Sequence, residues 1–403
     1  MKKLFALLTC LVLAGAYGCT KSETVTTGTG GSAGANLQGT PKVAYVTNGI
    51  ASFWVIAEKG AQDGAREFGA EVRVMMPGSD GVGDQKRMCQ DLLAQGIDGI
   101  AISPIDPDNQ GDLLSEIAQN TNMITHDSDA PNSDRLCYVG MDNYAAGRMC
   151  GQLVKEAMPD GGSVMIFVGR LGQANARQRR QGVIDELLER PVDPKRYDDP
   201  NDGEQKGDKY TILDTRTDGF DFAKAKEQAQ DAIARYPDLG CMVGLFAYNP
   251  PLILDAVREA GKIGKIKIVS FDEEDASLQG IKDGEIYGTT VQNPYEYGRQ
   301  SVQILAALKR GDQSVIPAGG VINIEARNIR KDNVDEFWSN LKGLLAEGST
   351  ATKGEVKPDT PEPDDFIRVE PIRGEPTKFE PVPDGTTAPD KPADTAAKPL
   401  SQE

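Results

Sequence analysis

The chain has 403 residues, of which 39% are hydrophobic and 26% are charged, a composition that suits a globular protein of two or three domains. Its formal net charge is −17. A nucleic-acid-binding surface needs clustered Lys and Arg, so this charge argues against one, and it also argues against docking on anionic lipid through a broad basic patch.

The first residues predict export. Two lysines precede a short apolar stretch that ends in small residues, which indicates a signal peptide over residues 1–18 rather than a membrane span. Gly18-Cys19 resembles a bacterial lipoprotein box, which implies a lipid on Cys19, and ordinary cleavage after Ala16 is the alternative. The Gly-, Ser- and Thr-rich residues 19–40 then predict a flexible tether.

From residue 41 to about residue 343, short apolar runs alternate with amphipathic stretches. The expected strands are 42–47, 71–75, 97–103, 122–126, 163–168, 210–214, 241–246, 265–271 and 286–291. The expected helices are 55–69, 84–95, 110–119, 143–157, 175–189, 222–235, 252–260, 276–282 and 295–309. Alternating strands and helices predict an α/β fold with doubly wound parallel sheets, and the span is too long for one open sheet, so we expect two lobes.

Two segments depart from this rhythm. Residues 191–209 form an acidic insertion whose spacing does not fit an EF-hand calcium loop, so a solvated loop is expected. Residues 346–403 are rich in Pro and acidic side chains, a composition that cannot bury a core and predicts a disordered tail.

Four cysteines remain after Cys19, and their spacing contains no Cys-x-x-Cys pair. A zinc site or a redox motif is therefore not expected. An oxidising compartment permits a disulfide, so buried free thiols and one disulfide both stay open. The residues concerned are Cys89, Cys137, Cys150 and Cys241.

Ligands of open α/β sheets bind beyond the carboxyl ends of the strands, and there this chain places aromatic, carboxylate, arginine and amide side chains. Carboxylates accept hydrogen bonds from hydroxyl groups, arginine donates in a fork, and aromatic faces cover apolar C–H surfaces. This combination indicates a sugar-like ligand.

The pieces occur in the order of the ribose-type periplasmic sugar-binding proteins of ABC importers, which the chain resembles over residues 41–335. The matching pieces are Ser52-Phe53-Trp54, Ile124-Thr125-His126-Asp127, Asp142-Asn143, Asn175-Ala176-Arg177-Gln178-Arg179, Gly219-Phe220-Asp221, Phe246-Ala247-Tyr248-Asn249, Phe271-Asp272 and Thr290-Val291-Gln292. The resemblance implies eight ligand-binding residues: Phe53, Trp54 and Phe220 as aromatic contacts, and Asp127, Arg177, Asn249, Asp272 and Gln292 as polar contacts.

The resemblance also implies a three-strand hinge with crossings near Met141-Asp142, Val291-Gln292 and Gly319-Gly320. Lobe 1 would then comprise residues 41–141 plus 292–319, and lobe 2 residues 142–291 plus 320–345. Where the family carries Asn, Arg and Asp-Glu, this chain has Ala51, Ser128 and Pro250-Pro251. We therefore expect a ligand other than ribose: another pentose, a hexose or a polyol.

These features predict a solute-binding protein of the periplasm or cell envelope, a lipid-anchored monomer without cofactor or metal that delivers a monosaccharide or polyol to an ABC permease. A sensor subunit that feeds a membrane receptor or sensor kinase is the alternative. A transcriptional regulator of this fold would begin with a helix-turn-helix. The chain has one histidine and no phosphate loop, so an enzyme is not expected, although Asp127 and Asp272 could act as a carboxylate pair on a glycoside.

Overall fold

The computed structural model describes residues 39–78 and 81–346. The predicted signal peptide, Cys19, most of the tether and all of the predicted tail except Ala346 lie outside these residues. Within the described part of the chain, no helix has both the length and the apolar character needed to cross a membrane.

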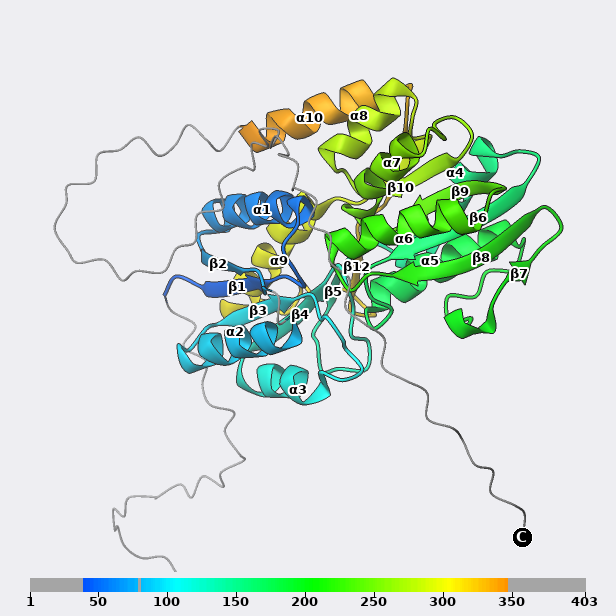
Figure 1. Ribbon diagram of the computed structural model, residues 1–403. Helices are drawn as coiled ribbons and strands as arrows, with labels where there is room; N and C mark the ends of the chain where they lie inside the picture. Colours follow the sequence, from blue (N-terminus) through cyan, green and yellow to red (C-terminus); the bar gives the residue numbers. More distant parts are fainter. Residues whose placement is uncertain (1–38, 79–80, 347–403) are drawn as a thin grey trace, which may run out of the picture. The chain divides into compact units, whose positions relative to one another are not determined.

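The first lobe is a parallel sheet of six strands in the order β12-β5-β4-β3-β1-β2, with helices α1, α2, α3 and α9 (Figure 1). Its elements are β1 Lys42–Val46, α1 Ser52–Phe68, β2 Glu71–Met75, α2 Val82–Ala94, β3 Gly99–Ile102, α3 Gly111–Asn120, β4 Asn122–His126, β5 Tyr138–Gly140, α9 Pro294–Lys309 and β12 Val321–Asn323. The central strands are buried along most of their length, as expected for strands covered on both faces.

The second lobe is a sheet of seven strands in the order β13-β11-β10-β9-β6-β8-β7, in which the two edge strands β13 and β7 run antiparallel. Its strands are β6 Gly162–Val168, β7 Gln205–Lys206, β8 Tyr210–Thr217, β9 Leu239–Gly244, β10 Lys267–Phe271, β11 Gly288–Val291 and β13 Arg327–Arg330. Its helices are α4 Asn143–Ala157, α5 Ala174–Leu187, the 3₁₀ turn η1 Pro200–Asp202, α6 Phe222–Arg235, α7 Asn249–Glu259, α8 Asp275–Asp283 and α10 Val334–Ala346.

The chain passes between the lobes after β5, after β11 and after β12. The third crossing differs from the prediction at Gly319-Gly320, because β12 pairs with β5 of the first sheet and the chain changes sheet only between Asn323 and Arg327. The two glycines have φ values of +91° and +61°. They form the turn that leads into β12, so the sequence signal that suggested a boundary marks a turn instead.

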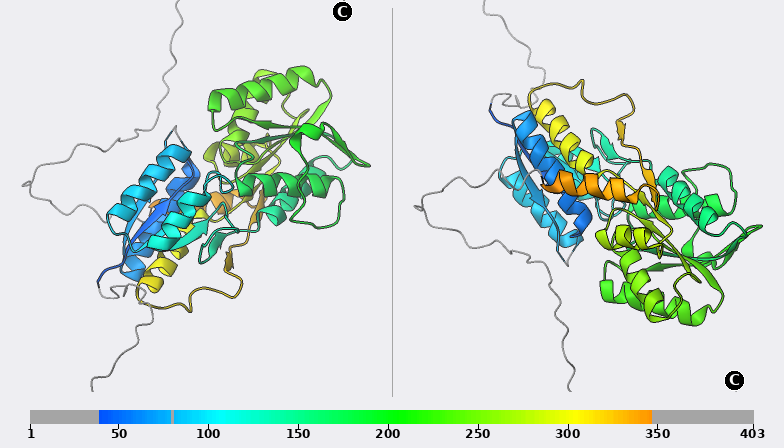
Figure 2. Two further views of the ribbon diagram at one scale, coloured as in Figure 1. Left: turned by 90° about the horizontal axis from the view of Figure 1, so that it is seen from below. Right: turned by 90° about the horizontal axis from the view of Figure 1, so that it is seen from above.

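Helix pairs in each lobe approach closely through glycine. A Cβ atom on Gly60 of α1 would lie 1.9 Å from the carbonyl oxygen of Tyr295, so only glycine permits this contact with α9. In the second lobe, a Cβ atom on Gly147 of α4 would lie 2.2 Å from the carbonyl oxygen of Arg179 in α5. Figure 2 shows α1 in blue beside α9 in yellow. This helix pair brings two parts of the sequence that are far apart in the chain into one lobe.

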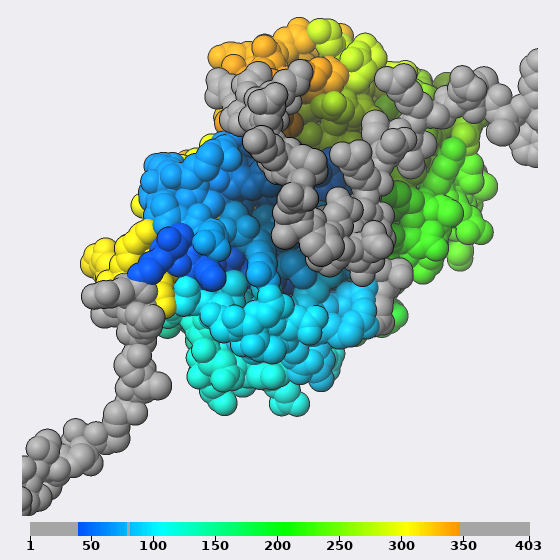
Figure 3. Space-filling view, turned by 90° about the vertical axis from the view of Figure 1, so that its left-hand side faces the viewer, coloured from blue at the N-terminus to red at the C-terminus, as the bar shows by residue number. Residues whose placement is uncertain are grey.

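The C-terminal helix α10 packs on the second lobe. Its residue Asp335 pairs with Lys282 of α8 at 2.6 Å, and the indole of Trp338 donates to Asp275 at 2.5 Å. Figure 3 shows α10 in orange beside the yellow-green α8. This helix and the strands β5, β12 and β13 are absent from the predicted elements. The three strands are too short to give a clear apolar run, and α10 is amphipathic but has no neighbouring strand pattern that would mark it as part of the fold.

The insertion at residues 191–209 is more ordered than the predicted solvated loop. It contains η1 and β7, and Asp198 binds α5 by accepting a hydrogen bond from Gln181 at 3.0 Å. Asp198 also pairs with Arg190, which lies three residues beyond the end of that helix. The acidic side chains therefore include one that fastens the insertion to the lobe.

Among the described residues, the structure decides between free thiols and a disulfide for the four cysteines. All four are buried free thiols, and none forms a disulfide. Burial raises the pKa of Cys150 to about 12, so its thiol stays protonated at neutral pH. These side chains act as small core residues: Cys89, Cys137, Cys150 and Cys241.

Candidate binding site between the lobes

A small cavity of about 30 Å³ lies where the carboxyl ends of both sheets meet. Both lobes contribute to its lining, which combines aromatic, carboxylate, amide and guanidinium groups. The lining residues are Asn48, Ala51, Phe53, Trp54, Asp127, Arg179, Phe220, Phe246, Ala247, Tyr248, Asp272 and Gln292.

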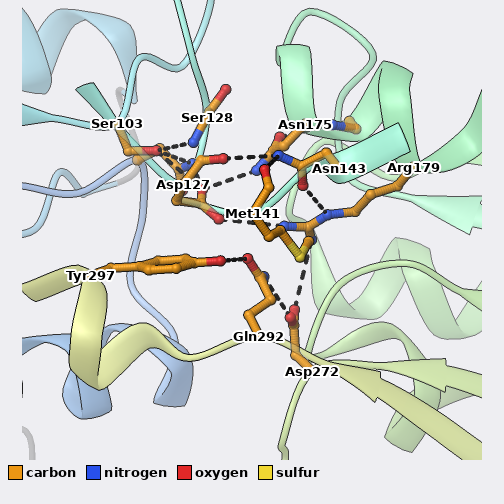
Figure 4. Close-up of polar contacts among 12 residues, drawn as sticks. Ser103, Asp127, Ser128, Met141, Asn143, Asn175, Arg179, Asp272, Gln292 and Tyr297 are labelled. Carbon is orange, nitrogen blue, oxygen red and sulfur yellow. Dashed lines mark hydrogen bonds and ion pairs between the residues drawn. The ribbon is translucent and has the colours of Figure 1, made fainter. Parts of the chain in front are cut away.

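Asp127 is the polar centre of the first lobe's side of the site (Figure 4). It follows β4 with φ of +56°, a left-handed conformation that is unusual for a residue other than glycine. Its Oδ2 accepts from Ser103 Oγ at 3.1 Å, from Asn48 Nδ2 at 3.3 Å and from Asn175 Nδ2 at 2.9 Å. Burial raises the pKa of Asp127, and the nearby Arg179 guanidinium opposes that rise.

Arg179 reaches from α5 to this carboxylate and is 1% exposed. Its Nη2 lies 3.4 Å from Asp127 Oδ1, and its Nη1 lies 3.9 Å from Asp272 Oδ2. Its Nε donates to Asn143 Oδ1 at 2.9 Å, which fixes the guanidinium plane. The guanidinium also lies 4.4 Å from the centroid of the Phe271 ring. One fixed cation therefore stands between two buried carboxylates.

Asp272 and Gln292 form a second hydrogen-bonded chain. Gln292 Nε2 donates to Asp272 Oδ1 at 2.7 Å, and the Tyr297 hydroxyl donates to Gln292 Oε1 at 3.1 Å, so the orientation of the amide is determined (Figure 4). Burial raises the pKa of Asp272 to about 6, while Arg179 and the Gln292 hydrogen bond lower it. Like Asp127, Asp272 has a left-handed backbone, with φ of +69°.

Aromatic side chains cover both sides of the cavity. Phe53 and Trp54 at the start of α1 meet edge to face, with ring centroids 4.7 Å apart. Across from them lie three rings of the second lobe, which we call the aromatic wall: Phe220, Phe246 and Tyr248. The cavity therefore has apolar faces and a polar edge.

Direct contacts join the two lobes around this cavity. Asp127 contacts Asn175 and Arg179 at its centre, as described above. Towards one side, Arg177 Nη2 pairs with Asp108 at 3.1 Å, and elsewhere Ser52 donates to Glu274. The structure therefore presents the lobes in contact, that is, in a closed arrangement.

Six of the eight predicted site residues line the cavity: Phe53, Trp54, Asp127, Phe220, Asp272 and Gln292. Arg177 does not, because its guanidinium donates to the carbonyl oxygens of Leu171 and Gly172 and pairs with Asp108. Arg179 takes that place. Side chains two positions apart on an α-helix differ in direction by about 200°, so the two arginines of the motif point to different sides of α5.

Asn249 is the second predicted residue that does not reach the cavity. Its Nδ2 donates to Asp218 Oδ2 at 3.0 Å, and its Oδ1 accepts from the Phe246 backbone N–H at 3.2 Å. Residues that the prediction did not select also line the cavity. Asn48 and Tyr248 lie one and two residues beyond predicted strands, so the sequence could have indicated them. The direction of the buried Arg179 side chain could not be predicted in this way.

Known proteins match this chain over most of its length. The sequence model of the periplasmic binding protein domain matches residues 43–313. The ribose import binding protein RbsB of Salmonella typhimurium is 24% identical over 283 residues, which cover 69% of this chain and 88% of that protein. The xylitol-binding protein of Mycolicibacterium smegmatis is 24% identical over 301 residues, which cover 73% and 79%.

Solved structures of binding proteins also match this chain over most of its length. A solute-binding protein of Burkholderia graminis in complex with D-arabinose superimposes with a TM-score of 0.64 and 26% identity, covering 73% of this chain and 96% of that one. The glucose-galactose binding protein GanP of Geobacillus stearothermophilus has a TM-score of 0.64 and 25% identity, covering 73% and 99%.

Proposed function

Because this chain belongs to the periplasmic binding protein family, we propose that it captures an uncharged sugar or polyol between its lobes and delivers it to an ABC permease. The observation that carries the proposal is the set Asp127, Arg179 and Asp272, which lies between aromatic side chains of both lobes. The names of the relatives support the ligand class, since they include binding proteins for ribose, allose and xylitol.

The site has the chemistry that a sugar requires. Carboxylates accept hydrogen bonds from hydroxyl groups, the guanidinium and the amide donate to hydroxyl oxygens, and aromatic faces cover C–H surfaces. Each of these groups is held in place by other side chains, so little side-chain entropy is lost on binding. The family binds solutes without transforming them, and we propose the same for this chain.

The charge of the site favours an uncharged solute. Of the described side chains that line the cavity, only Arg179 is cationic, and it already lies between Asp127 and Asp272. A uronate or a sugar phosphate would add negative charge next to two buried carboxylates, which is unfavourable without a further cation. We therefore expect neutral pentoses, hexoses or polyols and not their acidic derivatives.

Binding requires the lobes to separate first. A cavity of about 30 Å³ has room for about two water molecules, whereas small-molecule pockets measure about 300–1,000 Å³. In our proposal the ligand hydroxyls replace part of the contacts that Asp127 makes with Asn175 and Arg179. The ligand then stabilises closure because it touches both lobes at once.

The cell envelope is the proposed location. The family is periplasmic, and the sequence around Gly18-Cys19 supports a lipid anchor that keeps a monomeric binding protein at the membrane. Metabolic labelling with a radioactive fatty acid tests the anchor: the wild type should take up the label and Cys19→Ser should not, and an unlabelled wild type would contradict lipid attachment.

A thermal-shift screen against neutral monosaccharides, polyols and the matching uronates tests the binding function, with isothermal titration calorimetry of each positive. A ligand at 1,000 times its Kd stabilises the folded state by about 4 kcal/mol, which is readily detected. We expect a shift with at least one neutral compound and none with its uronate. The proposal fails if no neutral compound shifts the melting temperature, and the charge argument fails if the uronate binds equally well.

A further inference from the structure

We propose that Asp218 is the positioning residue of the aromatic wall, and thereby sets how tightly the second lobe holds the face of a sugar. This inference rests on the proposed function, because it assigns a role within the same site. Asp218 does not itself line the cavity. Its effect on a ligand therefore passes through Phe220, Phe246 and Tyr248.

One buried carboxylate holds two members of the wall directly. Asp218 is 3% exposed and lies just beyond β8. Its Oδ1 accepts from the Phe220 backbone N–H at 2.7 Å and from the Tyr248 hydroxyl at 2.5 Å. These two rings belong to different strand-to-helix connections, so the carboxylate ties the β8–α6 turn to the β9–α7 turn.

The third member is held through an amide. Asp218 Oδ2 accepts from Asn249 Nδ2 at 3.0 Å, and Asn249 Oδ1 accepts from the Phe246 backbone N–H at 3.2 Å. Asn249 therefore has both ends of its amide occupied behind the wall. The residue that the family resemblance suggested as a ligand contact acts, in this structure, as the link between Asp218 and Phe246.

The backbone at Phe220 explains why a strong acceptor is needed there. Phe220 has φ of +70°, a left-handed conformation that is disfavoured for a bulky residue unless its surroundings enforce it. The hydrogen bond from its N–H to the Asp218 side chain closes a turn of the type that Asp and Asn stabilise. Without this acceptor, the turn can relax and carry the Phe220 ring away from the cavity.

The packing behind the wall leaves little freedom to compensate. A Cβ atom on Gly169 would lie 2.9 Å from both the Phe220 ring and the Tyr248 hydroxyl, so the two rings already fill the space beside this glycine. Burial raises the pKa of Asp218, and its hydrogen bonds to Tyr248, Phe220 and Asn249 oppose that rise. The arrangement is therefore best tested by changing donors and acceptors without changing volume.

A reciprocal exchange supplies that test. In Asp218→Asn, the new amide donor faces the donor of Asn249; in Asn249→Asp, two carboxylates face each other. Each single variant should weaken binding of the sugar identified in the screen about tenfold, which corresponds to about 1.4 kcal/mol. The double variant, with an amide at 218 and a carboxylate at 249, restores a donor–acceptor pair and should bind within about threefold of the wild type.

Asp221→Asn is the matched control. Asp221 lies in the same turn, but its exposed side chain accepts from the Lys224 backbone N–H as the N-cap of α6, a task that Asn performs equally well. This variant should leave the Kd unchanged. Affinities are measured by calorimetry well below each variant's melting temperature, so that a general loss of stability does not enter the Kd.

The outcomes separate the two proposals. If the wild type binds no sugar-like compound, the proposed function fails. If it binds but both single variants keep its Kd, Asp218 only supports the fold and the positioning role is refuted. Weakening in the single variants without recovery in the double variant would equally refute the assigned hydrogen-bond pairing.

Discussion

Replacing Arg179 with alanine is the most direct test of the site. The wild-type guanidinium lies 3.4 Å from Asp127, 3.9 Å from Asp272 and 2.9 Å from the Asn143 oxygen, and it is almost fully buried. Its removal leaves two buried carboxylates without their cation. Breaking a buried ion pair in this way costs about 3–5 kcal/mol of unfolding free energy.

The same substitution removes a charged hydrogen-bond donor from the ligand. A hydrogen bond to a charged group contributes about 1.5–3 kcal/mol, so Arg179→Ala should weaken sugar binding about 10- to 100-fold. Urea unfolding measures the first effect, and calorimetry of the folded variant measures the second.

Arg180→Ala is the control that isolates the binding effect. Arg180 follows on the same helix and is equally buried, but it donates to Thr215 Oγ1 at 2.8 Å and to the carbonyl oxygen of Asp198 at 2.7 Å, away from the cavity. Its loss should lower stability and leave the Kd unchanged. Equal weakening of binding by both variants would refute the placement of Arg179 at the ligand.

Three further outcomes follow from the structure. Because the folded state binds the Asp272 proton more tightly than the unfolded chain, the contribution of Asp272 to stability should fall as pH rises from about 4 to 6. Asp272→Asn should lose this component, worth about 3 kcal/mol, so the difference in unfolding free energy between variant and wild type should change across this range. Urea titrations that show parallel pH profiles for the two proteins would contradict it. Gly147→Ala should destabilise the protein by about 1–3 kcal/mol and weaken sugar binding, since its Cβ would collide with the backbone of Arg179; calorimetry showing native affinity would speak against it. The melting temperature should be the same with and without reductant, and a drop on reduction would reveal a disulfide among the four buried thiols, Cys89, Cys137, Cys150 and Cys241.

Much of the fold follows from local pattern. The strands predicted to end in Thr47, Ser103 and His126 are short apolar runs bounded by polar residues, and they can be recognised from the sequence. The rule that ligands bind beyond such strand ends then leads to Asp127, Asp272 and Gln292. These side chains line the cavity because parallel strands bring their carboxyl ends to one edge.

The features that could not be predicted from the sequence depend on the direction of side chains and on contacts with residues that are distant in the chain. The sequence motif does not show whether Arg177 or Arg179 faces the cavity. That depends on how α5 is rotated about its own axis, and only tertiary packing determines this rotation. Asn249 is a plausible sugar ligand until Asp218 and the Phe246 N–H occupy its amide. The turn at Gly319-Gly320 resembles a boundary until β12 pairs with β5, a contact between residues far apart in the chain.

The first lobe is discontinuous in the sequence, and this has a consequence for biogenesis. Its sheet and helix layer remain incomplete until α9 and β12 arrive, because Gly60 of α1 packs against Tyr295 and β5 needs Val321–Asn323 as its neighbour. The second lobe is contiguous from α4 to β11 and lacks only an edge strand and one helix when β11 emerges. During vectorial synthesis the second lobe can therefore form most of its sheet while the first lobe, whose leading strands emerge earlier, still waits for α9 and β12.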